Sequence, residues 1–203
     1  ADKLLHRGRG GYCYEVNGLF AMALDALGIT YRFVAARPMF YPARRPKTHM
    51  ALIAEVDDRL WLCDLGFGSY GIRAPLAIDM TDTDIEQDFD TFRLIRDVNN
   101  EYLLQAKVEG AWANQYSFDL SPQEWIDFVP ANYLNSTHPD AIFVQKLLIV
   151  QHAPEGRLIL LGNLLKTITA EGIETQQLMD DGIALALKNR FALPVPQYIG
   201  KSA

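Results

Sequence analysis

The chain has 203 residues, of which 49% are hydrophobic, and its formal net charge is −6. A chain of this length and composition can bury a substantial core, in one large domain or two small ones. The negative charge predicts no general nucleic-acid binding, and no stretch approaches the roughly twenty apolar residues that a membrane helix needs. Two cysteines form no disulfide framework and four scattered histidines show no zinc spacing, so we expect no metal site.

The first predicted element is an apolar helix that opens at Cys13 and stops at Gly28. Its apolar residues recur three and four positions apart, which puts them on one face of the helix: Val16, Leu19, Phe20, Ala23, Leu24 and Leu27. Gly28 should end the helix in the left-handed conformation. A cysteine in the first turn faces the positive end of the helix dipole, which favours the thiolate. Cys13 is therefore either a nucleophile or a small buried apolar residue, the commoner fate of a free cysteine.

A strand and an irregular loop follow this helix. Aromatic and β-branched residues predict a strand over 31–37. The next segment, 38–47, contains three prolines and therefore predicts a loop without regular structure. Its basic residues either face solvent or bind phosphate groups, and they are Arg44, Arg45 and Lys47.

Two short apolar segments, 48–56 and 59–65, flank an aspartate pair that is typical of a tight turn. They predict an antiparallel hairpin. His49 lies near the start of the first strand and Asp64 near the end of the second, so the pairing should bring the two side chains together. Cys63 should point to the opposite face from its neighbour Asp64 and pack in the core.

Thiol transferases and thiol proteases share one arrangement, a cysteine at a helix N-terminus followed by a histidine and an acid on adjacent strands. In this chain His49 would take the thiol proton of Cys13, and Asp64 would fix the imidazole tautomer. Two plainer interpretations stay open. His49 could be a strand-end histidine bonded to backbone, and Asp64 could cap the turn that follows it. His138 is a rival base, but no acid is predicted on a strand paired with it.

The middle of the chain predicts an antiparallel meander that forms a barrel or a curled sheet. Its three β-prone segments are separated by short turns and cover residues 92–98, 102–108 and 112–118. The sequence Ser121-Pro122-Gln123-Glu124 resembles a capping box with proline at the first helical position. It predicts a short helix that begins at Pro122 and runs into residues 125–128.

The last third of the chain predicts a second β region and a closing helix. Residues 136–139 are interpreted as a loop. A hairpin is expected from 141–151 and 158–165, and 166–170 could add a strand. Partial apolar periodicity over 175–191 predicts the final helix.

Three stretches resemble the motifs of the arylamine N-acetyltransferase family. They read Arg-Gly-Gly-Tyr-Cys-Tyr-Glu-Val-Asn at 9–17, Thr-His-Met-Ala-Leu at 48–52 and Asp-Leu-Gly-Phe-Gly at 64–68. The resemblance continues more weakly through 132–139. It implies a catalytic triad, and the residues at the matching positions are Cys13, His49 and Asp64.

The resemblance also implies two binding regions. An acceptor-amine pocket would be lined by Tyr12, Pro38 and Phe67, and Pro38 stands where an aliphatic residue is expected. Coenzyme A would be bound by backbone and hydroxyl groups of Gly68, Ser69, Ser136 and Thr137.

The function implied by the resemblance is a two-step acetyl transfer. Acetyl-coenzyme A would acetylate Cys13, and a small aromatic amine or hydrazine would then take the acetyl group. The same triad also suits a thiol hydrolase, an amide synthase of the same family, or an inactive truncated relative. A reducing cytoplasm is the expected location, because the thiol must stay free. Neither a nucleic acid nor a membrane is expected as a partner, and self-association is left open.

The implied fold is α+β, with a cysteine-protease-like core in which the helix carrying Cys13 packs on antiparallel strands. We expect residues 1–30 to be the end of a helical domain with the cysteine helix. Residues 31–130 should form a β-barrel domain that carries His49 and Asp64, and residues 131–203 a C-terminal α/β lid. Family members carry a helical bundle ahead of the cysteine, and this chain is expected to lack it.

Overall fold

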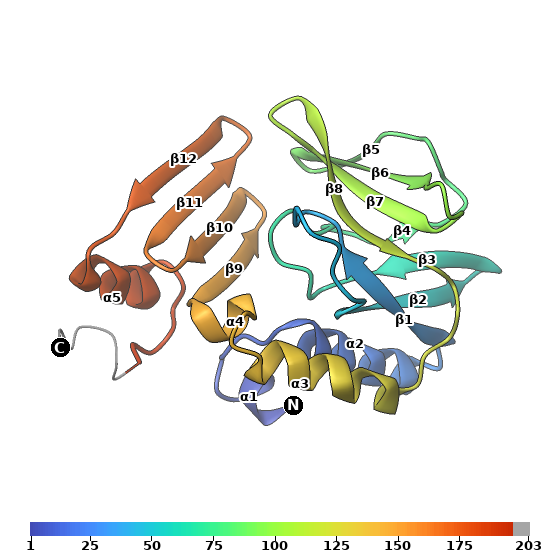
Figure 1. Ribbon diagram of the computed structural model, residues 1–203, viewed down its shortest axis with the longest axis horizontal. Coiled ribbons are helices and arrows are strands. Elements are labelled where there is room, and N and C mark those ends of the chain that lie inside the picture. Colours follow the sequence, from blue (N-terminus) through green and yellow to red (C-terminus); the bar gives the residue numbers. More distant parts are fainter. Residues whose placement is uncertain (197–203) are drawn as a thin grey trace. The chain divides into compact units, whose positions relative to one another are not determined.

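The computed structural model describes residues 1–196, which form two compact units. One unit is Gly11–His138, and the other joins Ala1–Gly10 to the chain from Pro139 onward. Both units combine helices with antiparallel sheets, so the fold is α+β (Figure 1). The predicted domain limits at residues 30 and 130 stay a prediction, and the last seven residues of the expected lid lie outside the described part of the chain.

The unit Gly11–His138 is built on a curled antiparallel sheet, shown in blue to green in Figure 1. Its spatial order is β4-β3-β2-β1-β8-β7-β6-β5. The strands are β1 (Tyr31–Pro38), β2 (His49–Val56), β3 (Arg59–Cys63), β4 (Leu76–Ala77), β5 (Ile85–Gln87), β6 (Asp90–Arg96), β7 (Tyr102–Val108) and β8 (Ala111–Phe118). The predicted strand, hairpin and meander are therefore confirmed.

Strand β2 is buried on both of its faces, because the sheet has a core on each side. Ala51 and Ile53 point into the concave core, with residues from β6, β7 and β8. Leu52 and Ala54 point the other way, toward helix α2 (Cys13–Leu27). Cys63 is buried in this second core, as predicted.

Helix α2 ends as predicted at Gly28, whose φ of 69° is left-handed. Of the apolar residues on the predicted face, Leu24 is buried and Phe20 packs against the core. Ala23 and Leu27 are exposed, and the residues that the helix buries are Cys13, Tyr14, Asn17, Gly18, Ala21 and Leu24. Apolar periodicity missed this face because it includes a hydrogen-bonded asparagine and a glycine, neither of which counts as apolar.

Two further predictions near the end of this unit are wrong. The short 3-10 helix η1 (Trp125–Phe128) is capped by Glu124, whose backbone N–H donates to the Asp127 carboxylate at 2.8 Å, and not by the Ser121 capping box. Helix α3 (Val129–Thr137) then follows directly, so residues 136 and 137 are helical rather than part of a loop.

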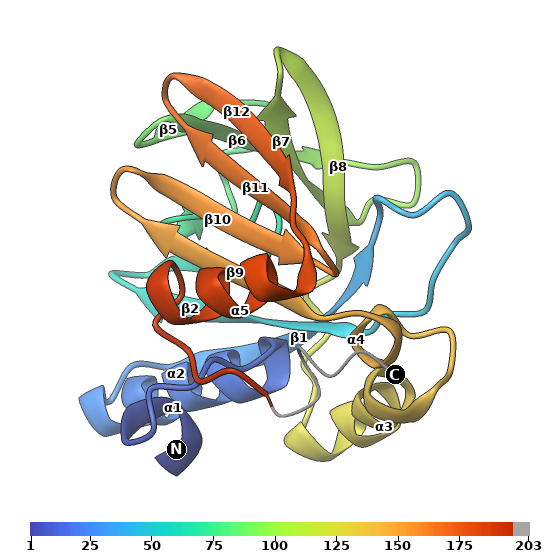
Figure 2. The ribbon, with the colours of Figure 1, turned by 90° about the vertical axis from the view of Figure 1, so that its left-hand side faces the viewer.

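The second unit contains a four-stranded antiparallel sheet of order β12-β11-β10-β9 (Figure 2). Ile183, Ala186 and Leu187 of helix α5, together with Phe191 beyond its end, pack with apolar residues of this sheet. Its elements are α1 (Asp2–Leu5), α4 (Ile142–Gln145), β9 (Leu148–Ala153), β10 (Gly156–Leu161), β11 (Leu164–Thr169), β12 (Gly172–Gln177) and α5 (Asp180–Asn189).

The sequence predicted this unit less accurately. The expected strand over 141–151 begins with helix α4 instead. The expected helix over 175–191 begins only at Asp180, because Thr175–Gln177 pair with β11 and complete the sheet. Local periodicity could not reveal that pairing, since it depends on a neighbouring strand.

Candidate active site

His49 and Asp64 meet at the open end of the β2–β3 hairpin. Asp57 and Asp58 have φ values of 53° and 58°, as a two-residue hairpin turn requires. The turn sets a register in which Leu52 is opposite Cys63. His49 Nε2 consequently lies 2.7 Å from Asp64 Oδ2, and both side chains are almost completely buried. The predicted contact is present.

Each member of this pair stabilises the charge of the other. Burial alone lowers the pKa of His49, but the charge and hydrogen bond of Asp64, with smaller contributions from Cys13, raise it to about 10. Burial alone raises the pKa of Asp64, but His49, Asn17 and the Gly66 N–H hold it below its ordinary value. Both shifts favour an imidazolium beside a carboxylate over a neutral pair.

Cys13 is the first residue of α2 and is 5% exposed. The preceding turn is fixed by the Tyr12 backbone N–H, which donates to the Glu15 carboxylate at 3.2 Å. The Cys13 side chain lies close enough to His49 to raise the pKa of that imidazole. The structure therefore brings Cys13, His49 and Asp64 together.

Asn17 joins this group, and the sequence analysis missed it. Its Nδ2 donates to the Met50 carbonyl at 2.7 Å and to Asp64 Oδ1 at 3.0 Å. Its Oδ1 accepts from the Leu65 N–H at 2.8 Å. Asn17 is thus fully buried and ties α2 to both strands of the hairpin. Its spacing of four residues from Cys13, on the same face of the helix, was the available signal.

Tyr116, on β8, is a second residue that the sequence analysis missed. Its ring packs 5.0 Å from the His49 ring and 4.8 Å from the Phe67 ring, measured between centroids. Burial first, and then the Asp64 charge, raise the pKa of Tyr116 well above its ordinary value. Its hydroxyl therefore stays neutral at physiological pH.

Comparisons with known proteins agree on one family. A family model described as N-acetyltransferase matches residues 1–199. Arylamine N-acetyltransferases of Mycolicibacterium smegmatis and Mycobacterium tuberculosis are 30% and 33% identical to this chain, which covers 74% and 71% of their lengths. These matches include 98% and 96% of this chain. This chain belongs to the arylamine N-acetyltransferase family.

Solved structures of arylamine N-acetyltransferases have the same fold. The Mycobacterium marinum enzyme in complex with CoA superimposes with a TM-score of 0.88 at 32% identity, over 95% of this chain and 73% of that one. The arylamine N-acetyltransferase / N-hydroxyarylamine O-acetyltransferase of Salmonella typhimurium is 34% identical over 87% of this chain. This chain spans 63% of the length of that relative.

The residues that the resemblance assigns to an acceptor pocket lie near other aromatic side chains. The Phe67 ring lies 5.0 Å from the His49 ring, in an edge-to-face arrangement. Pro38 ends β1, opposite Tyr116 on β8. The Tyr12 hydroxyl donates to Asn132. The Phe40 ring, which no motif in the sequence marks, lies 5.9 Å from that of Phe67.

The four residues expected to bind coenzyme A lie in two places. Gly68 and Ser69 have positive φ values, 53° and 51°, in a turn closed by a hydrogen bond from the Gly71 N–H to the Gly68 carbonyl. Ser136 and Thr137 end α3, and both hydroxyls donate to the Tyr133 carbonyl. Within residues 1–196, no hydrogen bond links either pair to Cys13, His49 or Asp64.

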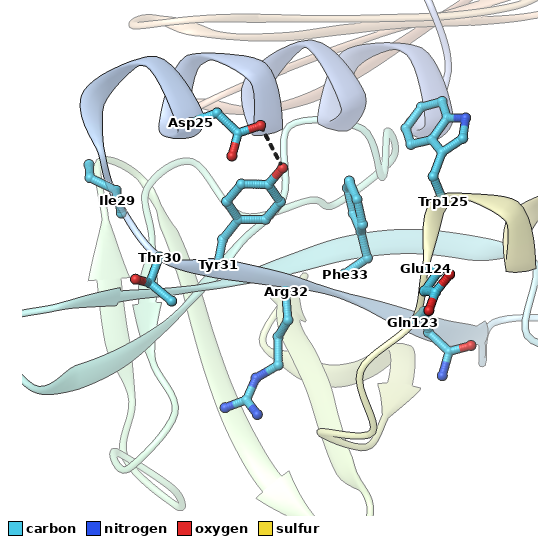
Figure 3. Close-up of a pocket in the computed structure, with 9 residues that line it drawn as sticks. All are labelled: Asp25, Ile29, Thr30, Tyr31, Arg32, Phe33, Gln123, Glu124 and Trp125. Carbon is cyan, nitrogen blue, oxygen red and sulfur yellow. Dashed lines mark hydrogen bonds between the residues drawn. The ribbon is translucent and has the colours of Figure 1, made fainter.

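A surface pocket of about 490 Å³ lies at the C-terminal half of α2 and the start of β1 (Figure 3). The Tyr31 hydroxyl donates to Asp25 in this pocket at 3.0 Å. Its walls include the aromatic rings of Phe33 and Trp125. None of the ten predicted site residues lines this pocket, so the pocket is separate from Cys13, His49 and Asp64.

Two negative observations concern the described residues alone. No helix among them is both long and apolar enough to cross a membrane. Residues 1–196 also contain no group of three histidine, cysteine or acidic side chains placed to hold a metal ion.

Proposed function

We propose that this chain transfers the acetyl group of acetyl-coenzyme A to arylamines or arylhydrazines through an acetyl-cysteine at Cys13. The observation that carries the proposal is the buried His49–Asp64 pair, 2.7 Å apart, beside a cysteine in the first turn of a helix. A helix that packs its cysteine on antiparallel strands also supports the cysteine-protease-like core expected from the sequence. The lid role of the C-terminal unit and the cytoplasmic location belong to the same proposal.

The first half-reaction forms a thioester. The Cys13 sulfur, as thiolate paired with the His49 imidazolium, attacks the acetyl carbonyl. Backbone N–H groups at the start of α2 stabilise the negative oxygen that forms. When the intermediate collapses, the bond to the coenzyme A sulfur breaks and that sulfur takes the proton of His49. Neutral His49 and acetylated Cys13 remain.

The second half-reaction restores the starting state. Acetylation removes the negative charge of Cys13, which is one of the contributions that raise the pKa of His49. Neutral His49 can therefore accept the proton of an incoming amine as its nitrogen attacks the thioester. The Cys13 thiolate leaves and pairs again with the imidazolium. Asp64 holds the ring orientation throughout, with Asn17 fixing the carboxylate.

The test is the intact mass of the protein after brief incubation with acetyl-coenzyme A, beside a Cys13→Ala control. We expect one added acetyl group, lost on addition of an arylamine and absent from the control. A folded protein that gains no acetyl group would contradict the proposal and favour an amide synthase with another acyl donor, or an inactive relative. An acetyl group lost equally fast without any amine would favour a thiol hydrolase.

A further inference from the structure

We propose that helix α3 positions the nucleophile and the base through two asparagines, Asn132 and Asn135. This inference rests on the proposed function, because it takes Cys13 and His49 in the roles assigned above. The two asparagines are three residues apart on α3 and therefore share one face of the helix. Each one forms a hydrogen bond with the residue that directly precedes Cys13 or His49 in the chain.

The contacts form two arms. In the first, the Tyr12 hydroxyl donates to Asn132 Oδ1. In the second, Asn135 Nδ2 donates to the Thr48 carbonyl at 3.0 Å and to the Tyr14 hydroxyl at 3.4 Å. The Tyr14 hydroxyl also donates to the Thr48 carbonyl, at 2.7 Å. The asparagine face of α3 thus holds both the residues that flank Cys13 and the residue before His49.

The second arm matters because of where β2 begins. Strand pairing with β1 starts at His49, opposite Ala36, and Thr48 precedes the strand. The loop before it, residues 39–47, contains no helix or strand. The Thr48 carbonyl is therefore a point at which side chains, rather than the sheet ladder, fix the approach to His49. Both of its side-chain donors come from helices, α2 and α3.

Positioning at this level should matter for the reaction. A base must lie within hydrogen-bond reach of the proton that it moves, and a displacement of about 1 Å can cost on the order of 100-fold in rate. Removal of both donors to Thr48 would let His49 shift relative to Cys13. The imidazolium would then pair less closely with the Cys13 sulfur, and the sulfur would react more slowly with an electrophile.

Other titratable groups also face this pair and must stay unchanged in the test. They are Tyr12 and Glu15 on α2 and its cap, Asp64 after β3, and Tyr116 on β8. None of them is substituted below. Tyr14 is substituted only by phenylalanine, which keeps the ring that packs against Phe128.

The experiment measures the rate of Cys13 alkylation by iodoacetamide against pH, by intact mass, in the whole chain. The variants are Asn135→Ala, Tyr14→Phe and the two combined. Asn135→Gln tests rescue by a longer amide. Tyr133→Ala, on the exposed part of α3, is the control. Alanine favours a helix more than asparagine does, so a weaker α3 would not explain a loss at Asn135.

We expect the combined variant to be alkylated roughly tenfold more slowly than the wild type at pH 6. The alkylation rate at high pH should be unchanged. Each single variant should lose less of the alkylation rate at pH 6, and Asn135→Gln should recover part of that loss. An unshifted profile in folded single and combined variants would overturn the proposal. A wild-type profile like that of a free cysteine would overturn it too.

The alkylation assay contains no acetyl-coenzyme A, so the two proposals can fail separately. The wild type could be alkylated faster than a free cysteine at pH 6, and the variants more slowly than the wild type, while acetyl-coenzyme A leaves no adduct. In that case the positioning role stands and the proposed function does not.

Discussion

Gly66 lies directly against Cys13: a Cβ atom on Gly66 would stand 2.5 Å from the Cys13 Cα and 2.8 Å from a Val16 methyl carbon. The first of these neighbours is backbone, which cannot rotate away. The loop after Asp64 can therefore pack on the first turn of α2 only because Gly66 has a hydrogen atom in place of a side chain. The relationship links the two ends of the proposed triad through contact rather than charge.

The substitution Gly66→Ala should therefore displace Cys13 from His49. We expect acetylation of Cys13 to fall by at least about tenfold, with a loss of stability of about 1–3 kcal/mol from overpacking. Gly71→Ala is the matched control, since the nearest atom to its added Cβ is 3.4 Å away and belongs to Gly68. Equal acetylation rates in the two variants, measured by intact mass, would contradict this interpretation of Gly66.

Asn17 should matter more for stability than a typical helix residue, because three hydrogen bonds depend on it. Asn17→Ala leaves Asp64 Oδ1 with one donor fewer, and it leaves the Met50 carbonyl and the Leu65 N–H without their side-chain partner. Each buried group so affected costs about 1–3 kcal/mol. Urea unfolding should therefore show a loss of at least about 2 kcal/mol. Asn189→Ala, at the exposed end of α5, provides the control.

Replacement of Asn17 by aspartate should be worse than replacement by alanine. The new carboxylate would face Asp64 where the amide now donates at 3.0 Å, so like charges would meet in a buried site. Acetylation should fall further than in Asn17→Ala and recover partly at low pH, as one carboxyl group is protonated. Identical pH profiles for the two variants would refute the role given to the amide.

The pH dependence of stability follows from the His49 pKa, raised from 6.5 to about 10. Below pH 6.5 the folded and unfolded states are both protonated, and the contribution of His49 to stability is complete. It declines as pH rises and is lost once pH passes about 10. Asp64, with a lowered pKa, contributes above 3.8 and loses its contribution as pH falls through its folded value.

This dependence can be measured as the difference in unfolding free energy between wild type and His49→Gln from pH 6 to pH 11. We expect the difference to be largest near pH 6 and to shrink steadily toward pH 10. Leu27→Gln, at an exposed position without a titratable group, should show no such trend. A difference that is constant over this range would mean that His49 is not an imidazolium in the folded protein.

Local signals in the sequence predicted the parts of the site that depend on short-range structure. The aspartate pair at 57–58 fixed the hairpin register, and with it the His49–Asp64 contact. Apolar periodicity could not predict the role of Asn17, because a buried polar residue does not contribute to that pattern. Tyr116 could not be predicted for another reason. The curl of the sheet brings β8 to His49, and no local pattern in the sequence indicates which distant strands become neighbours.

The predicted helix over 175–191 shows the same limit outside the site. Thr175–Gln177 suit a strand or a helix end equally well, and pairing with Leu164–Lys166 decides for the strand. Helix α3 is the opposite case. Its polar sequence around Asn132 and Asn135 resembles a loop, but those amides find partners on α2 and before β2 and so support a helix.

Phe40 should influence which amines are accepted. Its side chain is half exposed, and its ring stands 5.9 Å from Phe67, which in turn stands 5.0 Å from His49. The two phenylalanines therefore form an apolar wall that extends outward from the base. A single-ring amine can rest on Phe67 alone, whereas the second ring of a biphenyl-type amine would reach Phe40.

The substitution Phe40→Ala should raise the KM for a two-ring arylamine about fivefold to tenfold, an apolar contact of about 1–1.5 kcal/mol. The KM for a single-ring amine and the kcat for both should change little, because Phe40 lies beyond the reacting atoms. Leu27→Ala is the control: this exposed side chain lies at the far end of α2, about 20 Å from Cys13 by helix rise. A KM increase of the same size for both amines would show that Phe40 supports the site generally and does not select between acceptors.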